Sequence, residues 1–123
     1  MIRYRPCDDV GPLEDWAFDN PASNYRILSG APRPSGRIDV GGPGQVTRSG
    51  IWRCTEGAFE CTEQGDELMT ILSGRCRLTL NETGAAYELG PGDSLFVRDR
   101  SRVTWEMSET VTKVFFGYKS EGY

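Results

Sequence analysis

Short β-prone runs, separated by turn residues at nearly regular intervals, fill the sequence from Ser49 onward. None of these runs is long enough for a helix of ordinary length, whereas short and evenly spaced strands are typical of an all-β sandwich or barrel. We therefore predict an all-β fold. The predicted strands are residues 51–55, 58–62, 67–73, 75–81, 86–89, 94–98, 103–107 and 111–118.

Alternation of apolar and polar residues assigns faces to some of these strands. Cys76, Leu78 and Leu80 alternate with polar residues, so we expect them to face the core. The last predicted strand, 111–118, is apolar on both faces, which indicates a strand that is covered on both sides. A subunit interface would supply the second cover, and we therefore expect a homodimer.

The first 48 residues have a different character. Glycine and proline break this region into short pieces, especially in segments 30–36 and 41–44. Within it, residues 13–18 would form one helical turn and residues 24–29 a strand. We expect residues 1–48 to form an extended N-terminal arm, packed along the barrel or exchanged with a partner subunit, and residues 49–123 to form the barrel.

Length and charge exclude several kinds of partner. The chain has 123 residues, enough for one compact domain, and a net charge of −4. Its Lys and Arg residues are scattered, so we predict no nucleic-acid partner. No apolar stretch reaches the length of a membrane span, and the N-terminus lacks the apolar core of a secretory signal. We expect a soluble, cytoplasmic protein with no membrane partner.

Histidine is absent from the sequence. Its absence excludes imidazole metal ligands, histidine-based triads and histidine general bases. The cysteines, at positions 7, 54, 61 and 76, have neither a paired zinc-binding spacing nor the density of a disulfide scaffold, so we expect reduced thiols that fill space in the core. Cys61 has no lysine near it in the sequence, which favours an inert thiol over a nucleophile.

The densest acidic cluster consists of Glu63, Asp66 and Glu67. Two carboxylates close together in a cavity would raise the pKa of one of them and make it a general acid or base. Alternatively, Glu63 and Asp66 lie in a solvated loop and only Glu67 turns inward. Lys113 shares strand parity with the inward Val111, so Glu67 would be its partner, unless the lysine reaches water at the barrel rim.

Aromatic residues recur on the predicted strands. A barrel of this size leaves room for one small ligand, so the rings would line either a plain core or a ligand-binding box. These residues are Trp52, Phe59, Phe96, Trp105 and Phe115.

Several motifs stand in the order and spacing of a known family. Glu67 precedes the hairpin glycine Gly74, and residues 90–94 read Gly-Pro-Gly-Asp-Ser. The other shared segments are residues 52–57, 72–75, 104–106 and 109–114. Over about residues 49–118 the chain resembles the cupin superfamily and, within it, the cupin-3 group, which includes ureidoglycine aminohydrolase and ethanolamine-utilisation cupin domains. The resemblance implies a double-stranded β-helix, the cupin jelly-roll barrel.

The same resemblance bears on metal binding. Metal-dependent cupins usually place two histidines before the motif glutamate and a third in the second motif. Cys61 and Glu63 occupy the first two positions here, and the third falls at or near Val103, so the usual cage cannot form. We predict no cofactor. If a divalent metal were present, Cys61, Glu63 and Glu67 would hold it.

The region of the second motif is rich in arginine. Arg98, Arg100 and Arg102 stand where that motif has its proline, glycine and histidine neighbourhood. Arg98 would grip an anion at the barrel mouth. Alternatively, these arginines form a solvated face that discourages edge pairing.

Three functions follow from these residues. The first is a small cupin without the histidine cage that binds or transforms a small polar molecule bearing an amine or a carboxylate. Its catalytic residues would be Glu63, Glu67 and Lys113. The ligand would contact Trp52, Phe59, Cys61, Phe96, Trp105 and Arg98. The second is a metal-dependent, aminohydrolase-like enzyme using Cys61, Glu63 and Glu67. The third is a non-catalytic accessory or assembly subunit whose barrel is filled by side chains.

Overall fold

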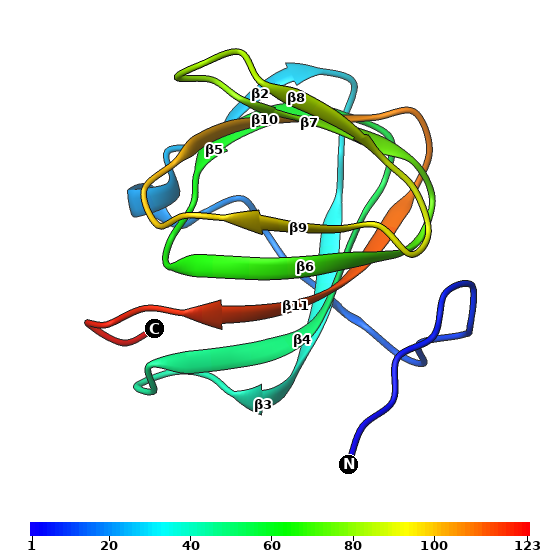
Figure 1. Ribbon diagram of the computed structural model, residues 1–123, viewed down its shortest axis with the longest axis vertical. Helices are drawn as coiled ribbons and strands as arrows, with labels where there is room; N and C mark the ends of the chain where they lie inside the picture. Colours follow the sequence, from blue (N-terminus) through cyan, green and yellow to red (C-terminus); the bar gives the residue numbers. More distant parts are fainter.

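The computed structural model describes residues 1–123 and consists of two antiparallel sheets that face each other (Figure 1). The six-stranded sheet contains, in spatial order, β1 (Glu14–Asp15), β3 (Pro34–Gly41), β4 (Thr47–Cys54), β11 (Val111–Tyr118), β6 (Asp66–Ser73) and β9 (Ser94–Val97). The five-stranded sheet contains β2 (Arg26–Ser29), β5 (Gly57–Thr62), β10 (Arg102–Met107), β7 (Cys76–Leu80) and β8 (Ala86–Leu89).

The strand order is that of a jelly roll. From β4 to β11 the chain crosses between the two sheets at every connection except the β7–β8 hairpin. Each strand predicted from residue 51 onward is present within a few residues of its expected bounds. The all-β prediction is therefore confirmed. No helix of the structure has the length and apolar character needed to span a membrane.

Side-chain alternation places the core between the sheets, as expected. Cys76 and Leu78 on β7 are buried, and so are Val103, Trp105 and Met107 on β10. The registers that join β10 to β5 and to β7 keep these inward residues side by side. Leu80 is half-buried against the same cluster.

The two ends of the barrel differ. Short connections at 55–56, 74–75, 90–93 and 108–110 close one end, on the right of Figure 1. We call this the closed end. The inward residues next to these connections are all buried, and they are Cys54, Ile71, Cys76, Leu89, Met107 and Val111. The opposite, open end carries connections 42–46, 63–65 and 98–101 together with the C-terminus.

Much of the expected N-terminal arm belongs to the sheets. β2 pairs with β5 and β3 pairs with β4, so the segment packs on the barrel as added strands. The expected division at residue 48 lies within β4. The strand predicted at 24–29 is present as β2.

The helical turn predicted at residues 13–18 is not formed. Glu14 and Asp15 are extended as β1, and the Trp16 ring lies against Gly36, where an added Cβ would be 2.3 Å from it. The helical turn is instead η1 (Pro21–Ser23), a 3₁₀ helix. The Asn20 side chain accepts from the Ala22 amide and caps this helix, and a proline opens it.

The outer face of the six-stranded sheet carries exposed apolar side chains. Phe116, Leu68 and Phe96 lie in register on β11, β6 and β9, and they are 52%, 50% and 54% exposed. Within one chain, the last strand is therefore not covered on both sides over this part of its length. The homodimer stays a prediction.

Candidate functional site

A cavity of about 790 Å³ opens at the open end of the barrel. Strands of both sheets and the segment that leads into β2 form its wall. Most of the residues predicted for the site line it, namely Trp52, Phe59, Cys61, Glu63, Glu67, Trp105 and Lys113. The alternation of sides along β4, β5, β6, β10 and β11 brings these distant positions together.

Two predicted ligand-binding residues do not line the cavity. Phe96 points to the outer face, because Leu95 and Val97 are the inward residues of β9. Three consecutive apolar residues on this strand leave its alternation ambiguous in the sequence. Arg98 is exposed in the connection between β9 and β10 and is absent from the cavity wall. Contact of Phe96 with a ligand inside the barrel is therefore not supported by the geometry, and the expected anion contact of Arg98 at the mouth stays a prediction.

Lys113 and Glu67 form an ion pair inside the cavity. Lys113 Nζ donates to Glu67 Oε2, and the two side chains are 7% and 14% exposed. Nζ also lies 5.0 Å from the centre of the Trp52 ring and 4.9 Å from that of Trp105. Such contacts stabilise a partly desolvated ammonium group. The pairing expected from strand parity is therefore present, and the lysine does not extend to bulk water.

Glu63 turns into the cavity although it stands one residue beyond β5. Its amide donates to Ser101 O at 2.9 Å, and its carbonyl accepts from the Arg100 amide at 2.9 Å. These two bonds continue the antiparallel pairing past Thr62, so the alternation that turns Cys61 inward also turns Glu63 inward. The alternative that left Glu63 in a solvated loop is wrong. Asp66 does serve the loop, since its carboxylate accepts from the Asp99 amide.

Burial raises the pKa of Glu63 to about 7, and the nearby Glu67 carboxylate adds to the rise. The Lys113 charge and hydrogen bonding from Trp105 and Cys61 oppose it. A carboxyl group in this environment is present in both its protonated and its ionised forms near neutral pH. Glu63 is therefore suited to donate or accept a proton.

Cys61 is a buried thiol in the wall of the cavity. Its Sγ lies 3.8 Å from Glu63 Oε1, to which it donates. Burial, and secondly the Glu63 charge, raise the pKa of Cys61, so the thiol is protonated at neutral pH. An unreactive thiol fits this environment better than a nucleophile.

Sequence reasoning did not single out the other residues of the wall, of which four matter for the site. Phe18 packs on Phe59 with ring centres 4.6 Å apart, and Tyr25 lies 4.8 Å from Phe18. Arg48 and Tyr123 stand at the rim, where the guanidinium carbon is 4.1 Å from the centre of the tyrosine ring. Phe18 and Tyr25 stand at the ends of a predicted helical turn and a predicted strand, but in the structure both lie in irregular segments, and no alternation in the sequence marked their rings as inward. Arg48 shares parity with Trp52 on β4, and that signal was available.

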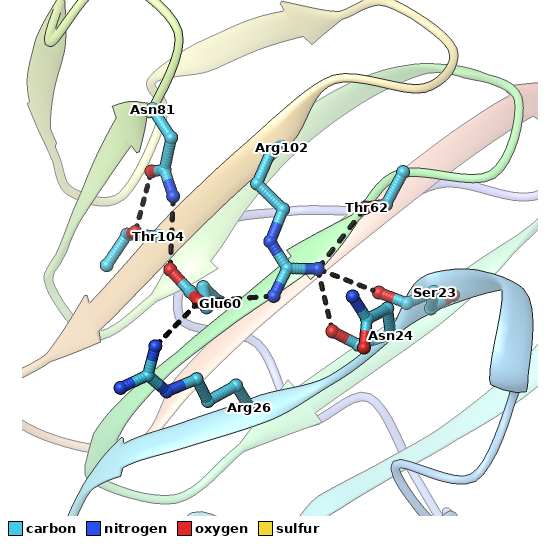
Figure 2. A network of polar contacts seen from close by, with 8 residues as sticks. All are labelled: Ser23, Asn24, Arg26, Glu60, Thr62, Asn81, Arg102 and Thr104. Atoms are coloured by element: carbon cyan, nitrogen blue, oxygen red, sulfur yellow. Dashed lines mark hydrogen bonds and ion pairs between the residues drawn. The ribbon is translucent and has the colours of Figure 1, made fainter.

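A polar network on the outer face of the five-stranded sheet fixes the segment that bears these aromatic residues (Figure 2). Arg102 Nη1 donates to the carbonyls of Ser23 and Asn24 at 3.2 and 2.7 Å, and its Nη2 lies 3.2 Å from Glu60 Oε1. Gln64 adds a bond from its side chain to Ala22 O at 3.0 Å. The network ties η1 to β5 and β10, so Phe18 and Tyr25 are held over the open end.

The family model of the EutQ-like cupin domain matches residues 41–115, more than half of the chain. This chain belongs to the EutQ-like cupin family. The resemblance to the cupin-3 group that the motifs indicated is thereby confirmed. No curated protein has a matching sequence.

Solved structures similar to this cupin share its fold. The chain is 16% identical to a putative ethanolamine utilization protein EutQ from Salmonella typhimurium, with a TM-score of 0.61 over 72% of this chain and 71% of that one. A EutQ protein from Clostridium difficile is 12% identical, with a TM-score of 0.62 over 74% and 71%. A protein of unknown function from Pseudomonas syringae pv. tomato is 23% identical, with a TM-score of 0.70 over 89% and 45%.

The donor set of this cupin does not fit a metal ion. No group of three or more His, Cys, Asp and Glu side chains is arranged to hold one. Lys113 already neutralises Glu67, and a metal at Cys61 would first have to displace a proton from a buried thiol whose pKa is raised. The ligand set Cys61, Glu63 and Glu67, expected for a metal-dependent alternative, is therefore not supported by the geometry.

Proposed function

We propose that this cupin binds a small polar organic molecule in the cavity at the open end and that Glu63 exchanges a proton with it. The observation that carries the proposal is the inward Glu63 carboxyl, held by main-chain bonds beside a cavity that is large enough for a small ligand. A proton donor and acceptor works best when its pKa is close to the working pH, and the pKa of Glu63 is about 7.

The other wall residues have complementary parts in this proposal. Lys113 has three N–H donors, of which Glu67 takes one, so the ammonium group retains donors for a ligand oxygen. Phe18, Tyr25 and Phe59 offer an aromatic surface to the apolar part of the ligand. The pair of Lys113 and Glu67 thus orients the ligand, while Glu63 acts on its proton.

The size of the cavity favours this function over that of an accessory subunit with a filled barrel. Buried apolar side chains pack together at the closed end, but at the open end the side chains leave about 790 Å³ between charged and aromatic groups. An open volume with a few convergent polar groups is typical of a ligand site.

A ligand screen at two pH values tests the proposal. Small amines, carboxylic acids and neutral amides would be added to the wild type, Glu63→Gln and, as a matched surface control, Glu82→Gln at pH 6 and pH 8, and thermal stabilisation recorded. We expect at least one class to stabilise the wild type, with a pH dependence that Glu63→Gln abolishes and Glu82→Gln retains. Failure of every class to bind would overturn the proposal.

A further inference from the structure

Two permanent cations line the cavity, and only one of them is neutralised. Lys113 is paired with Glu67, whereas Arg48 has no carboxylate within ion-pair distance. The acidic residues Asp15 and Asp19 also reach the wall but form no ion pair with Arg48. A guanidinium group beside a ligand cavity without an anionic partner is a candidate recognition group for an anion.

Strand register places Arg48 inside the rim. It lies on β4 opposite Gly117 of β11, on the same side as Trp52. Its guanidinium carbon is 4.1 Å from the centre of the Tyr123 ring and 6.0 Å from that of Phe115. Stacking occupies the flat face of a guanidinium group and leaves its N–H edge free to donate in the plane.

Two glycines make room for the ring that supports Arg48. A Cβ on Gly117 would lie 2.3 Å from Tyr123 Oη, and a Cβ on Gly65 would lie 2.6 Å from it, both much closer than atoms pack. Main-chain bonds hold the tyrosine, since its amide donates to Gln45 O at 2.9 Å and its main-chain oxygen accepts from the Gly44 amide at 2.8 Å. The guanidinium group therefore rests on a fixed support.

We infer that the cavity takes an organic acid whose carboxylate binds the N–H edge of Arg48 and whose apolar part lies on the aromatic wall. The inference rests on the proposed function and adds the class of ligand and the residue that selects it. Planar carboxylates match the fork of an arginine with two parallel hydrogen bonds, which a neutral amide of the same shape cannot reproduce. Arg48, rather than Lys113, is the anchor for the carboxylate, because Glu67 already neutralises the charge of the lysine.

Calorimetry with three probes of similar shape tests this ligand class. Phenylacetate, phenylacetamide and phenethylamine would be titrated into the wild type, Arg48→Met and Arg98→Met at pH 7. We expect the wild type to bind phenylacetate about tenfold more tightly than phenylacetamide, as a charge-assisted hydrogen bond provides. Arg48→Met should lose this preference. Arg98→Met, which removes an exposed arginine outside the cavity, should keep it.

A measurement on the wild type protects the test against misfolding of the variant. The Nε–H signal of Arg48, identified by its loss in Arg48→Lys, should shift in NMR spectra with phenylacetate and stay in place with phenylacetamide. Equal binding of the three probes, or an unmoved Arg48 signal on phenylacetate binding, would overturn the inference and leave the proposed function standing. If no compound of any class binds, both fall.

Discussion

The closed and open ends of the barrel use the same strands for different purposes. On β11, Val111 is completely buried at the closed end, and two residues further along the inward position is Lys113 in the cavity. On β4, inward Cys54 belongs to the packed core, whereas inward Arg48 reaches the rim. The comparison teaches that the two ends of one small barrel divide the work. Buried apolar residues at the closed end stabilise the fold, and charged residues at the open end line the cavity.

The largest effect should come from the closed end. Ile71→Ala removes a fully buried side chain on β6 and leaves a cavity, which should lower the free energy of unfolding by about 4 kcal/mol. Leu68→Ala on the same strand is the matched control, since Leu68 points outward and is half exposed, and it should cost less than about 1 kcal/mol. Urea denaturation measures both. Equal losses would contradict the division between core and surface.

At the boundary between the two ends, Lys113→Met should cost about 3 kcal/mol at pH 7, because it leaves Glu67 unpaired in a poorly solvated site. Adding Glu67→Gln should recover most of that loss. Lys119→Met changes the only other lysine, which lies in the C-terminal turn, and serves as the control. A double variant no more stable than Lys113→Met would mean that the lysine acts through packing alone.

The open end should make stability depend on pH. The pKa of Glu63 is raised from 4.5 to about 7 on folding, so the folded state binds more protons than the unfolded state between these values. Stability should therefore fall as the pH rises through this window, by about 3 kcal/mol in total. Glu63→Gln should remove this contribution and Glu82→Gln should not. The free energy of unfolding would be measured from pH 4.5 to 8. If Glu63→Gln shows the same pH dependence as the wild type, Glu63 is not the group that titrates.

The smallest effect concerns the segment over the open end. Arg102→Lys keeps the charge but loses the fork that binds Ser23, Asn24 and Glu60, and it should cost about 1 kcal/mol. Amide hydrogen exchange should speed up in residues 20–25 and stay unchanged at the closed end. Arg26→Lys, at an exposed position of the same network, is the control. Uniform exchange changes along the chain would show that Arg102 supports the whole barrel instead.

The alternation of apolar and polar residues predicted the inward face of some strands but not of others. The alternation in β7 and β10 is clean in the sequence, so their inward faces could be assigned correctly. Glu67 and Lys113 could be paired because each stands on a strand of regular parity. β9 has apolar residues on both faces, and for that reason Phe96 was misplaced.

The orientation of Glu63, which the sequence left open, and the aromatic residues that it missed both depend on long-range contacts. Glu63 lies beyond the end of β5, and its orientation comes from main-chain bonds to the segment 98–101, which no local pattern encodes. Phe18 and Tyr25 reach the cavity because Arg102 binds carbonyl oxygens far away in the chain. Every residue has a main-chain carbonyl acceptor, so the sequence does not indicate to which of them an arginine side chain will donate.

The distribution of the four thiols has a practical consequence. Cys7 is exposed, Cys54 and Cys76 lie in the packed half, and Cys61 borders the cavity. An alkylating reagent should therefore label Cys7 first and Cys61 more slowly, because the Cys61 thiol is buried in the cavity wall and its pKa is raised. Mass spectrometry of the wild type would give the labelling rate of each cysteine. The rate at Cys61 reports access to the cavity, and the rates at Cys54 and Cys76 report global unfolding.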